Sequence, residues 1–337
     1  MANGRDKLVR DQPVEMPAEQ GPLAQYHGAQ PPAPKWFEDA VAAPYRTAFA
    51  DCDGAKIHYQ SWGDASKPGL LLVHGNGAHA HWFDFIAPYL AQDYHVVAMT
   101  FSGMGDSDWR ETYTMETFAR EQLAVCEAAG FFGHADKPII VSHSFGGFVT
   151  ILTGAEYGER FTGIVIVDSP VNPPDRPRSG PPKAIRGNKV YPTLEAALAR
   201  FRLAPLQPCE NHYILDYIAR WSLRRKPMPE GTPEAGTDGW SWKFDPSIWQ
   251  RFSVSRPPQD LLRATRCRIA LMKGDKSVIW DDDVGDYMRG LLNRQVPFIE
   301  IPEARHHVML DQPLAFVAAL RTLLQEWQHS APVRVVG

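Results

Sequence analysis

A serine between an apolar strand pattern and a helix pattern is the residue best suited for chemistry. The run 138–141 is apolar, small residues follow it, and apolar residues then resume at helical spacing. In so tight a strand-to-helix turn, the positions two before and two after the central residue must be small. Ser142 and Gly146 meet this requirement around Ser144. A serine in such a turn can attack a carbonyl carbon and form an acyl intermediate, so Ser144 is the predicted nucleophile.

This turn and its flanking elements resemble the nucleophile elbow of the α/β-hydrolase superfamily, although Ser142 stands where the first glycine is usual. The resemblance extends over roughly residues 47–328. It implies a mostly parallel central sheet flanked by helices, with an inserted helical lid. It also implies a triad in the chain order serine, then histidine, with an acid that orients the histidine.

The histidine of the triad is expected between the last strand and the last helix. In similar hydrolases it commonly stands about seven residues before a proline near the start of that helix, here Pro313, which selects His306. His307 becomes the candidate if the loop register shifts. The imidazole would take the proton of the Ser144 hydroxyl and return it to the leaving group. Asp311 is the predicted N-cap of the last helix.

The acid of the triad departs from the superfamily's usual pattern. It commonly follows the seventh strand, three residues after a glycine, and Ser277 occupies that position here. Asp168, at the end of the sixth strand, is the first choice, because some members carry their acid there. Asp275 is the second candidate, and residues 281–283, all aspartates, are the third.

The apolar run 70–73 ends in a His-Gly turn that resembles the superfamily's oxyanion-hole loop. By this resemblance, the backbone amides of Asn76 and Phe145 would donate to the oxygen on which negative charge develops. His74 is expected to have a structural role rather than a catalytic one.

His79, His81 and Asp84 raise the possibility of a metal site, since His-x-His with a nearby acid occurs in binuclear zinc hydrolases. The acid stands at the wrong spacing, and no further histidine set follows at a matching position. We therefore predict neither a metal nor a cofactor.

The elements that must position these residues follow an α/β pattern. Short apolar runs alternate with helix-length segments, which is typical of parallel strands joined by helical crossovers. The predicted strands are 69–73, 94–99, 138–141, 164–167, 268–273 and 296–301, after a hairpin that turns at Asp53-Gly54.

Residues 46–168 and 256–337 form the predicted core, and residues 169–255 the predicted lid. Just over half of the 29 prolines lie between Pro170 and Pro258, among aromatic and arginine residues. Helices are predicted at 194–200 and 213–220, and the lid is expected to shape a largely apolar pocket. Residues 1–45 form a proline-rich arm that is expected to be extended or disordered.

Charge and cysteine usage exclude other classes. A net charge of -4 argues against a nucleic-acid partner, which requires clustered Lys and Arg. The four cysteines are widely spaced, and no signal peptide or membrane-spanning run is visible, so a cytoplasmic protein is expected. The composition leaves the oligomeric state open.

The predicted function is hydrolysis of a small, largely apolar carboxylic ester or lactone through an acyl-enzyme. The same triad could cleave a carbon-carbon bond or an amide. A ligand-binding receptor with this fold and little turnover is the alternative from another class, because the usual strand-seven acid is absent.

Overall fold

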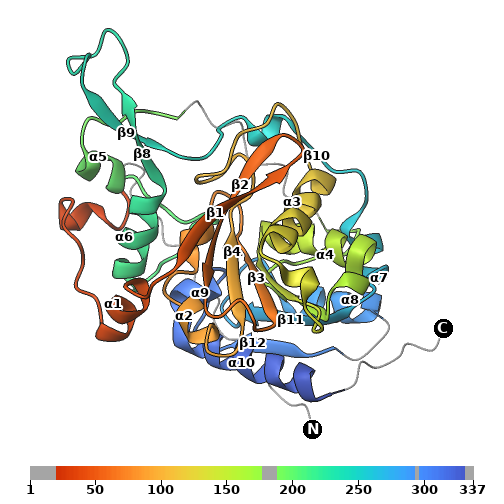
Figure 1. Ribbon diagram of the computed structural model, residues 1–337. Coiled ribbons are helices and arrows are strands. Elements are labelled where there is room, and N and C mark those ends of the chain that lie inside the picture. The colour runs from red at the N-terminus through yellow and green to blue at the C-terminus, as the bar shows by residue number, and fades with distance from the viewer. Residues whose placement is uncertain (1–19, 177–187, 293–295, 331–337) are drawn as a thin grey trace.

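The computed structural model describes residues 20–176, 188–292 and 296–330. An eight-stranded sheet forms its centre, in the order β1-β2-β4-β3-β6-β7-β11-β12 (Figure 1). The strands are β1 Arg46–Cys52, β2 Ala55–Trp62, β3 Gly69–Val73, β4 His95–Met99, β6 Ile139–His143, β7 Gly163–Val167, β11 Arg268–Gly274 and β12 Phe298–Ile301. The six strands β4, β3, β6, β7, β11 and β12 run parallel to one another, whereas β1 and β2 are antiparallel to their neighbours. The α/β class and the six predicted core strands are confirmed.

Helices cover both faces of the sheet because its central strands are apolar on both sides. Helices α2 and α10 lie on one side of the sheet, and helices α3, α4, α7 and α8 lie on the other (Figure 1). In β3, Leu70 and Leu72 belong to the core cluster on the first side, and Leu71 and Val73 belong to the cluster on the second. The helices are α2 Ala87–Leu90, α3 Met115–Ala128, α4 Phe145–Tyr157, α7 Pro258–Arg263, α8 Asp282–Leu292, α9 Val308–Asp311 and α10 Pro313–His329. Short 3-10 segments at Ala80–Trp82, Phe131–Gly133 and Gly158–Arg160 lie in the connections between these elements.

The opening hairpin joins β1 and β2 through Asp53 and Gly54. Their φ angles are 46° and 76°, so both central residues are left-handed, as a type I′ turn requires. Asp and Gly tolerate this conformation, and the predicted hairpin is confirmed.

Residues 188–255 contribute no strand to the central sheet. They form α5 Leu194–Leu198, α6 His212–Trp221, an antiparallel hairpin of β8 Leu223–Pro227 with β9 Asp238–Trp242, and a 3-10 turn Ile248–Gln250. Strand β10 Phe252–Ser253 pairs with β5 Tyr113–Thr114. Both predicted helices are present, and the Thr193 side chain caps α5. The β8-β9 hairpin was not predicted, so the segment is mixed rather than helical; residues 177–187 lie outside the described chain.

The N-terminal arm was predicted to be extended or disordered, but residues 20–45 contain helical segments. This part forms a 3-10 turn Ala24–Tyr26 and the helix α1 Lys35–Val41. Pro31, Pro32 and Pro34 precede α1, and Pro34 stands at its N-cap, where its carbonyl accepts from the Phe37 amide at 3.0 Å. Phe37 is 5% exposed, and its ring lies 4.9 Å from that of Tyr213 in α6. The prediction for residues 1–19 lies outside the described chain.

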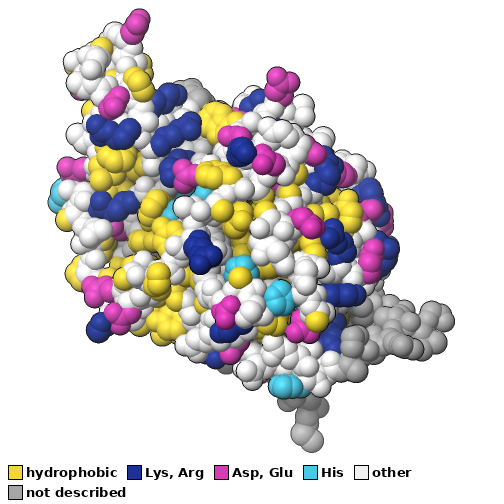
Figure 2. Space-filling view, in the orientation of Figure 1, with side chains coloured by type: hydrophobic (Ala, Val, Ile, Leu, Met, Phe, Trp, Pro, Cys, Tyr) yellow, Lys and Arg dark blue, Asp and Glu magenta, His cyan; other side chains and the backbone are white. Residues whose placement is uncertain are grey.

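The surface carries charges of both signs. Figure 2 shows acidic and basic side chains interspersed over much of one face, with basic ones near the β8-β9 hairpin. In β8, Arg224, Arg225 and Lys226 are exposed. None of the helices in the described ranges is long and apolar enough to span a bilayer.

Candidate active site

Ser144 lies in the turn between β6 and α4, with φ 52° and ψ -121°. A non-glycine residue in this region costs about 1–3 kcal/mol and persists only where its neighbours fix the backbone. Here the Ser144 amide donates to the Val167 carbonyl at 2.9 Å, and its carbonyl accepts from the Gly147 amide at 2.9 Å. A Cβ on Gly146 would lie 2.4 Å from the His74 carbonyl oxygen. The small residue expected at position 146 is therefore needed for α4 to begin so close to the neighbouring loop.

Three of the predicted site residues meet beside this turn. The Nε2 of His306 lies 2.9 Å from the Ser144 Oγ, and its Nδ1 lies 3.3 Å from the Asp168 Oδ1. Asp168 is fully buried, and His306 is 1% exposed. When Nδ1–H donates to the carboxylate, Nε2 is left with the lone pair that can accept the Ser144 proton. This arrangement can turn a hydroxyl group into a nucleophile.

Asp168 is fixed by the strand next to its own. Its backbone is left-handed at φ 47°, and its amide donates to the Met272 carbonyl at 2.8 Å. Its carboxylate accepts from the Gly274 amide at 3.1 Å and from the Ser277 hydroxyl at 2.8 Å. Ser277 holds the position where similar hydrolases carry the acid, and here it hydrogen-bonds to a carboxylate from the neighbouring strand. No local signal could reveal this contact between residues 109 positions apart.

The other candidate acids are not brought to His306. Asp275 is exposed in the turn after β11. Asp281 forms an ion pair with Arg176 at 2.7 Å and accepts from the amide of Val284. Asp282 and Asp283 are exposed in the first turn of α8.

The backbone around His306 is held by two side chains that sequence reasoning had not assigned to it. The His143 Nε2–H donates to the His306 carbonyl at 2.9 Å. The Asp311 carboxylate accepts from the Arg305 amide at 2.7 Å, and burial raises the pKa of Asp311 to about 6. The prediction that Asp311 caps the last helix is wrong, because Gln312 stands at the N-cap of α10 and Asp311 folds back onto the histidine loop.

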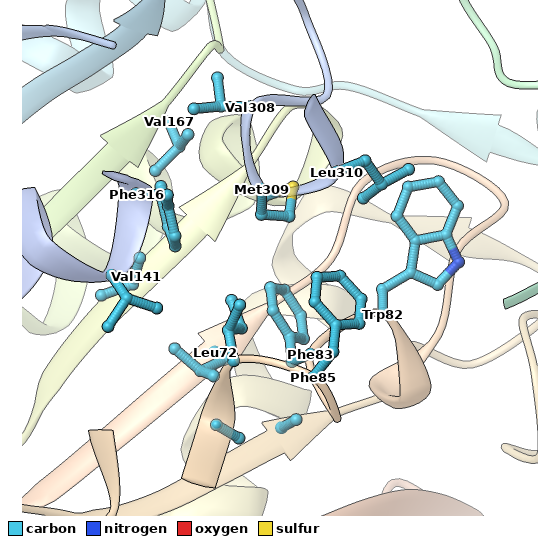
Figure 3. Packing of buried hydrophobic residues seen from close by; sticks show 14 of the residues in the cluster. Leu72, Trp82, Phe83, Phe85, Val141, Val167, Val308, Met309, Leu310 and Phe316 are labelled. Atoms are coloured by element: carbon cyan, nitrogen blue, oxygen red, sulfur yellow. The ribbon is translucent and has the colours of Figure 1, made fainter. Parts of the chain in front are cut away.

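The segment after the histidines is anchored in the hydrophobic core. Figure 3 shows Val308, Met309 and Leu310 of α9 directed into the same cluster as Phe83 and Phe316. All five side chains are at most 2% exposed. This packing fixes the end of the loop, so His306 is positioned by the core as well as by hydrogen bonds.

The loop after β3 packs against the elbow. A Cβ on Gly75 would lie 3.0 Å from the Ser144 Cβ. Phe145 is the first residue of α4, and the first amides of a helix have no partner within it. In the described chain, neither the Asn76 amide nor the Phe145 amide donates a hydrogen bond. Both amides are therefore without a protein acceptor among the described residues, and their role as oxyanion donors stays a prediction.

His74 stabilises this loop through two hydrogen bonds to the backbone. Its Nδ1–H donates to the Gly75 carbonyl at 2.6 Å, and its Nε2 accepts from the Phe101 amide at 3.0 Å. Burial lowers the pKa of His74 to about 4, so the ring is neutral at pH 7. These contacts give it the structural position that was expected.

The segment 188–255 contacts the site from several sides. Gln207 donates to the Asp311 carboxylate at 3.0 Å and accepts from the His307 amide at 3.1 Å. The Trp249 ring lies edge-on to that of Phe145, with the centroids 5.1 Å apart. The predicted lid segment therefore touches both the histidine loop and the start of α4.

The His79, His81 and Asp84 group is a hydrogen-bonded interior cluster. The Nδ1 of His81 lies 2.7 Å from the Asp84 carboxylate, and His79 lies 2.8 Å from the Ser222 hydroxyl. The His81 ring stacks on Trp221 at 3.6 Å. The structure thus uses these histidines to join the loop after β3 to α6.

Residues 70–320 match the alpha/beta hydrolase family. The chain is 31% identical over 118 residues to human serine hydrolase-like protein, and 24% identical over 120 residues to mouse epoxide hydrolase 4. These matches cover 34% and 35% of this chain but only 56% and 32% of those proteins. A thioesterase domain from the curacin biosynthetic pathway has the same fold, with a TM-score of 0.65 and 20% identity over 84% of this chain and all of that domain. Because the family match spans most of the sequence, this protein belongs to the alpha/beta hydrolase family.

Proposed function

We propose that this protein is a serine hydrolase that cleaves a small, largely apolar carboxylic ester or lactone through an acyl-enzyme. The observation that carries the proposal is the line of Ser144, His306 and Asp168, with 2.9 Å and 3.3 Å between the facing atoms. A serine at the elbow favours acyl transfer, whereas opening an epoxide on this fold requires a carboxylate there.

In the proposed reaction, the Ser144 Oγ attacks the carbonyl carbon while the His306 Nε2 takes its proton. The amides of Asn76 and Phe145 donate to the oxygen that becomes negative. The tetrahedral intermediate then collapses, and His306 protonates the departing alkoxide. Water next attacks the acyl-enzyme, His306 takes the water's proton, and the acid is released as Ser144 regains its own proton.

Asp168 acts in both steps without exchanging a proton. Its carboxylate holds the imidazole with Nδ1 protonated and stabilises the imidazolium that forms. The amide of Gly274 and the hydroxyl of Ser277 hold the carboxylate in place and satisfy it by hydrogen bonds.

The apolar substrate is inferred from the side chains beside the elbow. Phe145 is 9% exposed and packs against Trp249. We place the acyl or alcohol group of the substrate along such aromatic surfaces, with the segment 169–255 acting as the lid.

A fluorophosphonate probe tests the proposal, because it labels only an activated serine. We expect wild type to be labelled and Ser144→Ala to remain unlabelled. Ser142→Ala is the matched control, since this serine lies two residues earlier and its hydroxyl donates to the Val165 carbonyl. Absence of labelling on folded wild type would refute the proposal. Turnover of p-nitrophenyl esters of graded chain length, with matched anilides, would then define the substrate.

A further inference from the structure

We propose that His143, His306 and His307 form a zinc site that switches the enzyme off. If one ring nitrogen is taken from each histidine, the three nitrogens all lie within 4.8 Å of one another. All three side chains are at most 3% exposed. The binding part of this inference stands on its own, and the loss of activity rests on the proposed function.

His307 supplies the observation that points to a ligand. Neither of its ring nitrogens has a hydrogen-bond partner in the described chain, although the side chain is 97% buried. A buried polar group without a hydrogen-bond partner destabilises the folded state by about 1–3 kcal/mol, so a ligand that binds this imidazole would remove that penalty.

The distances fit a site that contracts on binding. Zinc–nitrogen bonds of about 2.0–2.1 Å at tetrahedral angles place two ligand nitrogens about 3.4 Å apart. The nitrogens now lie within 4.8 Å of one another, so a pair at that limit must close by about 1.4 Å. Three imidazoles are a suitable ligand set for zinc, and water or the Ser144 hydroxyl can take the fourth position.

Asp168 should strengthen zinc binding through its contact with the other ring nitrogen of His306. A histidine that binds zinc usually donates its other ring N–H to a carboxylate, which fixes the tautomer and makes the ligating nitrogen more basic. His306 already has this arrangement, because its Nδ1 faces the Asp168 Oδ1 and its Nε2 keeps the lone pair. The buried carboxylate also offsets part of the charge of the ion. Ser144, which contacts this Nε2, is only partly buried, and we place the entry of the ion on that side.

Zinc and the catalytic proton would then compete for the same lone pair. When zinc occupies the His306 Nε2, this atom cannot accept the proton of Ser144. Zinc should therefore inhibit reversibly and should slow labelling by a fluorophosphonate probe. Removal of the metal with EDTA should restore both.

The test variant is His307→Phe, which keeps a planar ring but removes two unpartnered nitrogens. Each protein is compared with its own metal-free activity. We expect His307→Phe to raise the zinc concentration for half-inhibition at least about tenfold, because one of three ligands is lost. His95→Phe is the control, since this buried histidine lies in β4 and packs against Phe131, away from the cluster. Equal inhibition of wild type and His307→Phe would overturn the proposal.

Direct binding separates the site from the reaction. Ser144→Ala retains all three histidines, and competition with a chromophoric zinc chelator should show one equivalent bound. Adding His307→Phe should weaken that binding by the same factor. If folded wild type resists the probe but Ser144→Ala still binds one zinc through His307, the proposed function fails and the site stands. If Ser144→Ala binds no zinc, the site is refuted whatever the activity.

Discussion

Replacing Asp168 with asparagine removes the charge that faces the imidazole of His306, the proposed general base. The carboxylate Oδ1 lies 3.3 Å from the His306 Nδ1. At an effective dielectric constant of about 20, two unit charges at this distance attract by about 5 kcal/mol. This attraction exists only after His306 has taken the Ser144 proton, so its loss falls on the transition state. At 1.36 kcal/mol for each factor of ten, kcat should fall about 10³–10⁴-fold while KM changes little.

A second substitution tests whether position is what matters. The Ser277 hydroxyl lies 2.8 Å from the Asp168 Oδ1, so a carboxylate at position 277 should reach the same edge of the imidazole. In the Asp168→Asn background, Ser277→Asp should recover about 10–100-fold in kcat, because it restores a charge in an altered geometry. Asp275→Asn is the control, since this carboxylate is exposed and should leave kcat near wild type.

The assay is steady-state hydrolysis of the best p-nitrophenyl ester, with circular dichroism and thermal unfolding to establish that each variant folds. A folded Asp168→Asn variant that keeps more than a tenth of wild-type kcat would refute the assignment of the acid. A large loss in Asp275→Asn would move the assignment to that residue. If the double variant is no better than Asp168→Asn, a carboxylate at position 277 does not act on His306.

Three further predictions concern stability and the oxyanion loop. Burial lowers the pKa of His58 and His74 to about 4, so below pH 6.5 the unfolded chain binds protons that the native chain does not. Each of the two histidines should therefore lower the free energy of unfolding by about 2 kcal/mol as the pH falls from 6.5 to 5. An unchanged urea midpoint would contradict this. Arg110→Met leaves the fully buried Glu121 carboxylate without its cation and should lower the free energy of unfolding by about 3–5 kcal/mol in urea titrations. Gly75→Ala would bring a Cβ to 3.0 Å from the Ser144 Cβ, so probe labelling should fall while the thermal midpoint stays within a few degrees.

The features that sequence could predict are those that arise from local patterns. A run such as 69–73 is apolar at every position, which indicates a strand buried on both faces, and the structure has β3 at these residues. The elbow is also local, because the need for small residues around Ser144 follows from the steric limits of one turn. The turn at Asp53-Gly54 follows from backbone preferences of two residues.

Local pattern failed where prolines and aromatic residues serve packing at a distance. The prolines before α1 suggested an arm without structure, but they only mark where the helix begins. Phe37 then buries its ring against Tyr213, a partner nearly two hundred residues away in the chain. The β8-β9 hairpin was missed because its exposed Arg224, Arg225 and Lys226 do not alternate with apolar residues.

By itself, the sequence determined the fold class, and it predicted Ser144 as the nucleophile and the order of the triad, because each of these depends on residues within a short stretch. Only the tertiary structure decided which carboxylate faces His306. Asp168 and Asp275 both follow apolar strands, and nothing local distinguishes them. The choice depends on β7 lying beside β11, so that Ser277 and the Gly274 amide hold Asp168 in the interior while Asp275 faces the solvent. A carboxylate can orient an imidazole only from within hydrogen-bond reach, and that reach is set by how the strands assemble.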